Sequence, residues 1–185
     1  TIDAYTAFAS LLNASGDRDG AVAALEAARD VQDPKRLQAD ATLATLYLNT
    51  GRYADAAAVY QRMLEAGIED PDGVRRMSLA EVQILAGNGE QAIDTLDRLP
   101  SNLEQSAAAQ VLRADAIRSL GREEEAGDLL DSAIARNPDF APGFMKRGQL
   151  IIERLRRVEQ GEEELPESTR TALLNDAIAD RNKAV

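Results

Sequence analysis

The stretch GRYADAAAVY, residues 51–60, decides the fold because its spacing recurs at three other places in the chain. Each copy has a glycine, an alanine five residues later, and a large side chain four residues beyond the alanine. The glycines are Gly16, Gly51, Gly87 and Gly121, the alanines Ala21, Ala56, Ala92 and Ala126, and the large residues Leu25, Tyr60, Leu96 and Leu130. Successive alanines are 35, 36 and 34 residues apart, which indicates a repeated structural unit.

The shared positions predict a pair of helices in each unit. A glycine after a helical stretch can adopt a left-handed conformation that ends the helix and turns the chain. The alanine then lies one turn into the second helix, where two backbones must approach closely, and the large residue lies on the same face. A proline near the end of each unit breaks the second helix; these are Pro34, Pro71, Pro100 and Pro138.

This pattern resembles the tetratricopeptide repeat family, and its best single match is LATLYLNTGRYADAAAVYQRMLEAG, residues 43–67. The resemblance implies an all-α fold, a right-handed α-α superhelix of about five antiparallel helical hairpins. The expected repeats span about 2–34, 37–70, 72–100, 104–138 and 139–185. We expect residues 1–185 to form a single domain of a longer, bacterial protein.

The repeats depart from the family pattern at one position of the first helix. An aromatic residue usually stands there, and the chain has Tyr5 and Phe144 in its first and last repeats. The middle repeats carry Asp40, Arg76 and Gln110 instead. We therefore expect the middle repeats to bury less aromatic surface.

The fifth repeat is longer than the others. Its small residue, Ala177, lies 51 residues after Ala126, about one repeat plus 17 residues. A continuous helical face runs through Phe144, Gly148, Ile151, Leu155 and Val158. The polar segment 159–168 predicts the turn, and Ser168 is the candidate N-cap of the next helix. We expect an elongated hairpin whose last helix faces water, since Arg181 stands where earlier repeats have Leu or Tyr.

Composition excludes several classes of function. The chain of 185 residues has no His and no Cys, which excludes a Ser-His-Asp triad, a thiolate nucleophile and a His/Cys zinc site. The formal net charge of -11 disfavours nucleic acid, and no apolar run is long enough to insert into a membrane. The acidic runs 122–126 and 161–165 fall at a helix start and in a loop, so we expect no enzymatic activity and no cofactor.

One segment fits two structures. Ser15, Asp17, Asp19, Gly20 and Glu26 approach the spacing of a calcium-binding EF-hand loop, with Ser in place of the leading Asp. The same residues fit the repeat, where they begin the second helix. They cannot be both a wrapped loop and a helix, and three sister copies favour the helix. We therefore expect no metal site.

Members of the family bind partners mainly on the concave surface, which the first helices line. Mapping through the glycine register places these residues there: Asn13, Thr45, Leu48, Asn49, Met77, Glu81, Ile84, Val111, Asp115, Arg118, Met145 and Gln149. Leu85 and Ile152 follow from the same register. The Lys/Asn/Arg clamp by which some members hold acidic chaperone tails is absent. The mixed polar and apolar surface suits an apolar or helical peptide.

We therefore expect a protein–protein interaction scaffold that binds a peptide segment or a partner protein in its groove. The alternative is a substrate-recruiting or assembly domain of a larger enzyme or of an exopolysaccharide-export or secretion protein. The sequence leaves the partner, the oligomeric state and the compartment, cytoplasm or periplasm, open.

Overall fold

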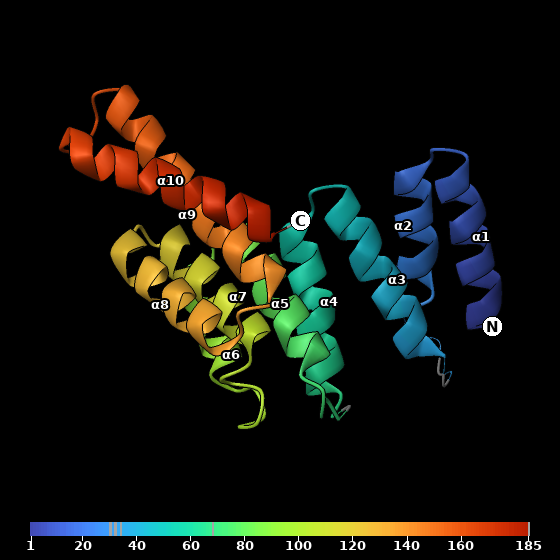
Figure 1. Cartoon of the computed structure of the whole chain (residues 1–185). Coiled ribbons are helices and arrows are strands. Elements are labelled where there is room, and N and C mark those ends of the chain that lie inside the picture. Colours follow the sequence, from blue (N-terminus) through green and yellow to red (C-terminus); the bar gives the residue numbers. More distant parts are fainter. Residues whose placement is uncertain (30, 32, 34, 68, 185) are drawn as a thin grey trace. The chain divides into compact units, whose positions relative to one another are not determined.

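The computed structural model describes residues 1–29, 31, 33, 35–67 and 69–184, and in these residues all regular secondary structure is helical (Figure 1). Pro34, one of the expected helix breakers, lies outside the described residues. The helices are α1 (Ile2–Ala14), α2 (Arg18–Ala27), α3 (Arg36–Asn49), α4 (Tyr53–Glu65), α5 (Val74–Leu85), α6 (Gly89–Leu96), α7 (Ala107–Ser119), α8 (Glu123–Arg136), α9 (Ala141–Glu159) and α10 (Glu167–Lys183).

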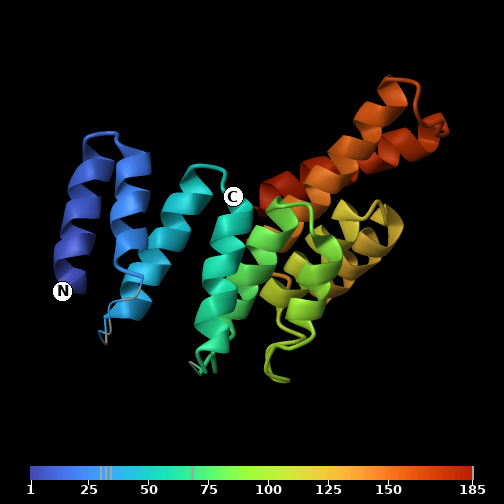
Figure 2. The ribbon, with the colours of Figure 1, turned by 180° about the vertical axis from the view of Figure 1, so that it is seen from behind.

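Consecutive helices pack in pairs, α1 with α2 and so on to α9 with α10, so the described chain forms five helical hairpins (Figures 1 and 2). The expected fold class, an all-α solenoid of antiparallel hairpins, is confirmed. The packing divides the chain into two compact units, Thr1–Arg98 and Leu99–Val185. The first unit contains three hairpins and the second contains two.

The motif glycines turn the chain as their spacing predicts. Gly16, Gly51, Gly87 and Gly121 follow the first helices of their hairpins and all have positive φ, between 71° and 88°. A side chain at such a φ is strained, whereas glycine adopts it freely. The tight connection between the two helices of a regular hairpin therefore depends on these four residues.

The motif alanines lie at the contact between the helices of each hairpin. Ala21, Ala56, Ala92 and Ala126 are at most 1% exposed. The large residues four positions on, Leu25, Leu96 and Leu130, are buried, and Tyr60 is half-buried. Small side chains thus let the helices approach, and large ones on the same face fill the space between them.

The last hairpin is elongated, as expected. Helices α9 and α10 have 19 and 17 residues, whereas no other helix exceeds 14. The prediction that Ser168 caps α10 is wrong. The cap is Pro166, whose extended backbone leads into a helix at Glu167, and its carbonyl accepts the first helical hydrogen bond from Arg170 N at 3.0 Å.

The segment with calcium-loop spacing forms the turn after α1 and then helix α2. Helix α2 begins at Arg18, and the Asp17 side chain caps it by accepting a hydrogen bond from Gly20 N at 2.9 Å. Glu26 lies in the last turn of α2, where its carboxylate accepts a hydrogen bond from the Tyr47 hydroxyl of α3. These residues therefore follow the repeat rather than wrap around an ion.

Candidate partner-binding surfaces

In the unit Thr1–Arg98, the first helices carry the predicted groove residues with unequal exposure. Asn13, Thr45, Asn49 and Glu81 are exposed, while Leu48, Met77 and Ile84 are half-buried. Helix α5 presents Met77, Glu81 and Ile84 at intervals of four and three residues, so these side chains form one stripe along the helix. Leu85, next to this stripe, is 49% exposed.

In the unit Leu99–Val185, Val111 is an exception to the predicted set. It is only 6% exposed, because α7 packs against both α8 and α9, so its side chain belongs to the core and does not line an open groove. Its counterpart on α9, Met145, is 57% exposed, and Gln149 is also exposed. Met145, Gln149 and Ile152 on α9 repeat the spacing of the α5 stripe.

The remaining predicted residues, Asp115 and Arg118, belong to an ionic network that joins α7 to α9. The Asp115 carboxylate lies 2.6 Å from Lys146 Nζ, and Arg118 Nη1 lies 3.1 Å from Glu153 Oε2. Gln149 Nε2 donates a hydrogen bond to Glu153 Oε1 at 3.0 Å. The structure thus brings Asp115, Arg118 and Gln149 together.

Sequence reasoning missed Lys146 and Glu153 in this network. The available signal was the opposite charges on the two first helices, since Lys146 and Glu153 follow Asp115 and Arg118 by 31 and 35 residues, which is close to the repeat length. The salt bridges of this network connect α7 to α9, so they hold α9 in place beside the stripe of Met145, Gln149 and Ile152.

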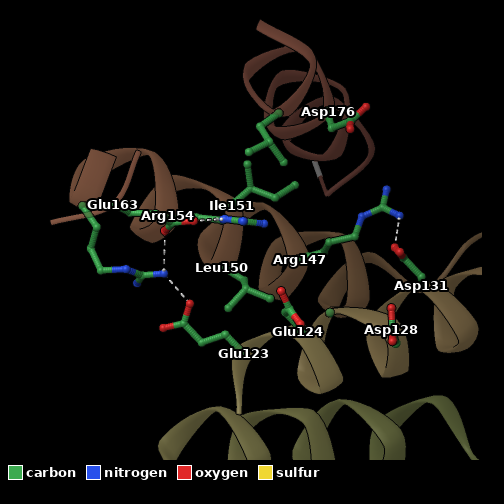
Figure 3. A pocket seen from close by; sticks show the side chains of 13 residues that line it. Glu123, Glu124, Asp128, Asp131, Arg147, Leu150, Ile151, Arg154, Glu163 and Asp176 are labelled. Atoms are coloured by element: carbon green, nitrogen blue, oxygen red, sulfur yellow. Dashed lines mark hydrogen bonds and ion pairs between the residues drawn. The ribbon is translucent and has the colours of Figure 1, made fainter. Parts of the chain in front are cut away.

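A cleft lies between the second helix of the fourth hairpin and the elongated last hairpin (Figure 3). It has a volume of about 600 Å³ and is lined by residues of α8, α9, α10 and the turn between the last two helices. Leu150 and Ile151 of α9 and Leu173 of α10 supply apolar surface. Gly127 of α8 has no side chain to project into the cleft. A Cβ at this position would lie 3.7 Å from Leu150 Cδ2, in van der Waals contact with it.

The arginines in the cleft are paired, whereas several of its carboxylates are not. Arg147 Nη1 contacts Asp131 Oδ1 at 2.6 Å, and Arg154 Nε contacts Glu163 Oε1 at 2.8 Å (Figure 3). Arg157 pairs with Glu123. The hydrogen bonds to Asp180 and Asp131 raise the pKa of the Arg147 guanidinium above its ordinary value. Three further carboxylates also line the cleft: Glu124, Asp128 and Asp176.

The balance of charge in the cleft is therefore acidic. Six carboxylates and three guanidinium groups line it. The sequence predicted the elongated hairpin but not this cleft, because the length of two helices does not determine how far their tips stand from the preceding hairpin.

Two properties of the described residues limit the chemistry. No group of acidic side chains in them is arranged to hold a metal ion, and none of their helices is long and apolar enough to cross a membrane. The candidate binding features of these residues are therefore the apolar stripes on the first helices, the ionic network beside one stripe, and the acidic cleft with its apolar residues.

Comparison with known proteins identifies the repeat. A family model of the tetratricopeptide repeat matches residues 6–71 and 77–141, more than half of the chain. No curated protein sequence matches the chain. Three similar structures have low sequence identity, so they show the fold alone.

A crystal structure of MamA is 18% identical, with a TM-score of 0.67 over 98% of this chain and 92% of that one. MamA from Desulfovibrio magneticus RS-1, from residue 41 to its end, is 15% identical, with a TM-score of 0.65 over 98% and 95%. YrrB, described as a TPR protein with an unusual peptide-binding site, is 20% identical, with a TM-score of 0.59 over 96% and 85%. With its repeated helical hairpins and the match to the family model, the chain belongs to the tetratricopeptide repeat family.

Proposed function

We propose that this chain is a non-catalytic protein-interaction scaffold that binds a peptide segment of its partner along the open faces of its first helices. The observation that carries the proposal is the stripe Met145, Gln149 and Ile152 on α9, in which two apolar side chains that are 57% and 49% exposed flank a polar one. The stripe Met77, Glu81 and Ile84 on α5 has the same order of residue types.

Such a stripe suits a peptide because its parts have different roles. The flexible thioether of Met145 adapts to different apolar side chains, and Ile152 adds a rigid apolar contact. Gln149 can hydrogen-bond a peptide backbone, although its amide also donates to Glu153. The salt bridges from α7 to α9 hold the stripe in place, which lowers the ordering cost of binding.

The peptide-binding site in the description of YrrB is consistent with this use of the fold, and it supports the proposal by analogy. The chemistry of the stripe narrows the ligand to segments with apolar side chains on one face. A helical segment with apolar residues at intervals of three and four would match the spacing of Met145 and Ile152.

Selection of random peptides displayed on phage against the immobilised chain would test the proposal. The enriched peptides would be synthesised with a fluorophore, and their affinity measured by fluorescence anisotropy. Replacing both Met145 and Ile152 with Glu should weaken binding by about tenfold or more, because a few apolar anchors supply most of the binding energy in such interfaces. Helical circular dichroism would show that the variant folds.

The matched control replaces Leu174 and Ile178 of α10, two apolar residues that are each 52% exposed, with Glu. It should leave the affinity unchanged. Equal affinity of every enriched peptide for the wild type and the double variant would rule out the α9 stripe as the binding surface.

The cleft between α8, α9 and α10 is a second candidate surface, and its charge favours a different segment. Its excess of carboxylates around Leu150, Ile151 and Leu173 suits a peptide with Arg or Lys next to apolar residues. Peptides of this kind should lose affinity for a variant with Glu124→Lys and Asp128→Lys.

The matched control for the cleft has the same charge changes at the same repeat positions on α6, Glu90→Lys and Asp94→Lys, both of which are exposed. If the two variants weaken the basic peptides equally, the effect is long-range charge and not contact in the cleft.

A further inference from the structure

The contact between the fourth and fifth hairpins, where α8 faces α9, lacks a side chain that the earlier hairpins have. Gly127 directly follows the motif alanine of α8, Ala126. The residue after the motif alanine is Val22 in α2, Ala57 in α4 and Ile93 in α6. Glycine inside a helix destabilises it relative to alanine, and Gly127 has no positive φ that would require glycine. Its presence in α8 therefore needs another reason.

Crowding does not explain the glycine, but its effect on Leu150 does suggest a reason. A Cβ at position 127 would lie 3.7 Å from Leu150 Cδ2, which is ordinary van der Waals contact. Leu150 is half-buried, whereas its counterparts in α3, α5 and α7, Leu46, Val82 and Ala116, are at most 5% exposed. The missing side chain thus leaves apolar surface of Leu150 open. This opening lies between two hairpins of the unit Leu99–Val185 and not at an end of the chain.

The opening is part of the cleft of about 600 Å³, and salt bridges between α8 and α9 bound it on two sides. Arg147 pairs with Asp131 at 2.6 Å, and Arg157 pairs with Glu123. Figure 3 shows Asp131 and Glu123 on opposite sides of Leu150. These pairs neutralise the two guanidinium groups, so the space around Leu150 is framed without an excess of positive charge.

Three carboxylates beside this space are not neutralised. Glu124 and Asp128 of α8 and Asp176 of α10 line the cleft and are exposed (Figure 3). None of them forms an ion pair within the part of the chain that the structure describes. Glu124 and Asp128 are four residues apart on one helix, where like charges repel each other. A cationic group between them would remove this repulsion.

We propose that a partner segment binds here through one large apolar side chain, which takes the place of the side chain that Gly127 lacks and packs on Leu150. An Arg or Lys next to it in the segment pairs with Glu124 and Asp128. The inference rests on the proposed function, in which the cleft is the second candidate surface, and it identifies the anchor of that surface. A desolvated apolar anchor supplies most of the affinity in such contacts, and the complementary charge selects a basic segment.

Filling the space from inside the chain tests the proposal. The probe is a short fluorescent peptide with one Leu flanked by Arg, and its affinity is measured by fluorescence anisotropy. Gly127→Ile, which introduces the residue that α6 carries, should weaken binding by about tenfold or more, and Gly127→Ala should weaken it less. Both variants should unfold at higher urea concentrations than the wild type, because they remove a glycine from a helix. The matched control Ala135→Ile, at an exposed position of α8 outside the cleft, should leave the affinity unchanged.

Two altered peptides test the same contact on the wild-type chain, so the proposal does not depend on the folding of a variant. Replacing the Leu of the probe with Ser, or its Arg residues with Glu, should weaken binding by about tenfold or more. No binding of the probe, equal binding of the Ser peptide, or unchanged affinity of a folded Gly127→Ile variant would each overturn the proposal. Binding that is lost in the variant with Met145→Glu and Ile152→Glu but kept in Gly127→Ile would also overturn it, while supporting the α9 stripe of the proposed function.

Discussion

Three middle repeats replace the usual aromatic residue of the first helix with polar side chains, and the structure gives each of them partners. Asp40 Oδ1 accepts a hydrogen bond from Arg62 Nη2 at 2.8 Å, and Gln110 Nε2 donates to the Glu104 carbonyl at 2.6 Å. Arg76 Nη1 lies 3.0 Å from Asp70 Oδ2. The repeats therefore connect their elements by hydrogen bonds at a position where aromatic packing is common. Of the buried side-chain polar atoms in the described residues, Arg62 Nε has no hydrogen-bond partner.

Tyr47 makes a similar link between hairpins. Its ring is buried on α3, and its hydroxyl donates a hydrogen bond to the Glu26 carboxylate of α2. Burial, with that hydrogen bond, raises the pKa of the Tyr47 phenol to about 12. The neutral phenol is therefore favoured in the folded chain.

This shift predicts a loss of stability in alkaline solution. The pKa of the Tyr47 phenol in the folded chain lies above its unfolded value of 10.0. The contribution of the neutral phenol to the free energy of unfolding is therefore fully present below about pH 10 and is lost as the pH rises through about 12. The free energy of unfolding should fall by about 2–3 kcal/mol over this interval, from about 1.4 kcal/mol per pKa unit. Urea unfolding of Tyr47→Phe should lack this part of the decrease, and Tyr53→Phe should retain it. Parallel pH profiles for the wild type and Tyr47→Phe would contradict the assignment.

Among the elements, the elongated hairpin has the most extensive polar connection between its two helices. Arg147 of α9 donates to Asp180 of α10 through Nε at 2.8 Å and Nη2 at 2.5 Å, and Asp180 is only 1% exposed. The helices approach closely there, because a Cβ at Gly148 would lie 3.5 Å from the Asp180 Cβ. Phe144, buried one turn before Gly148, completes this contact, and Lys183 Nζ lies 5.0 Å from its ring centre.

Breaking the Arg147–Asp180 pair should loosen α10 from α9. Asp180→Asn keeps the shape of the side chain but removes its charge, so the half-buried guanidinium of Arg147 loses its charged partner on α10. We expect the free energy of opening of α10, measured by amide hydrogen exchange, to fall by about 2 kcal/mol. Asp176→Asn, on the exposed side of the same helix, should change it little. If the amides of α10 exchange at the same rate in Asp180→Asn and Asp176→Asn, the Arg147–Asp180 pair does not hold the hairpin together.

The sequence predicted the hairpins well because their signals are local. Gly51, Ala56 and Tyr60 lie within ten residues, and each acts through backbone conformation or the face of one helix. The cap of α10 shows the limit of such signals, since Pro166 and not Ser168 begins the helix. Proline already has a fixed φ, and the chain enters the helix at Glu167, whose carboxylate is favourable near the helix N-terminus.

The candidate surfaces were harder to predict because exposure depends on neighbouring elements. Val111 and Met145 share one register position, yet Val111 is covered by the packing of α8 and α9 on α7, and Met145 is exposed. Register assigns a residue to a face of its helix, but only the tertiary structure shows whether another helix covers that face. The cleft depends in the same way on the spacing of α8, α9 and α10.

For the whole molecule, repetition gives each unit its own version of one surface. Met77 on α5 and Met145 on α9 stand at the same register position, in separate compact units. A scaffold built in this way can present the same kind of apolar contact more than once along the chain. Binding at these stripes would change the surroundings of the two methionine side chains, which can be observed individually.

The three methionines of the chain allow the most direct test, because they are Met63, Met77 and Met145 and differ in burial. Met63 of α4 is 4% exposed and lies in the hydrophobic core, whereas Met145 is 57% exposed on the α9 stripe. NMR spectra of the chain with ¹³C-labelled methionine methyl groups should contain three resonances, assigned by substituting each residue in turn. On saturation with a peptide selected against the chain, we predict that the Met145 resonance shifts and that the Met63 resonance does not. An unchanged Met145 resonance, with the peptide shown to be bound by fluorescence anisotropy, would contradict the account.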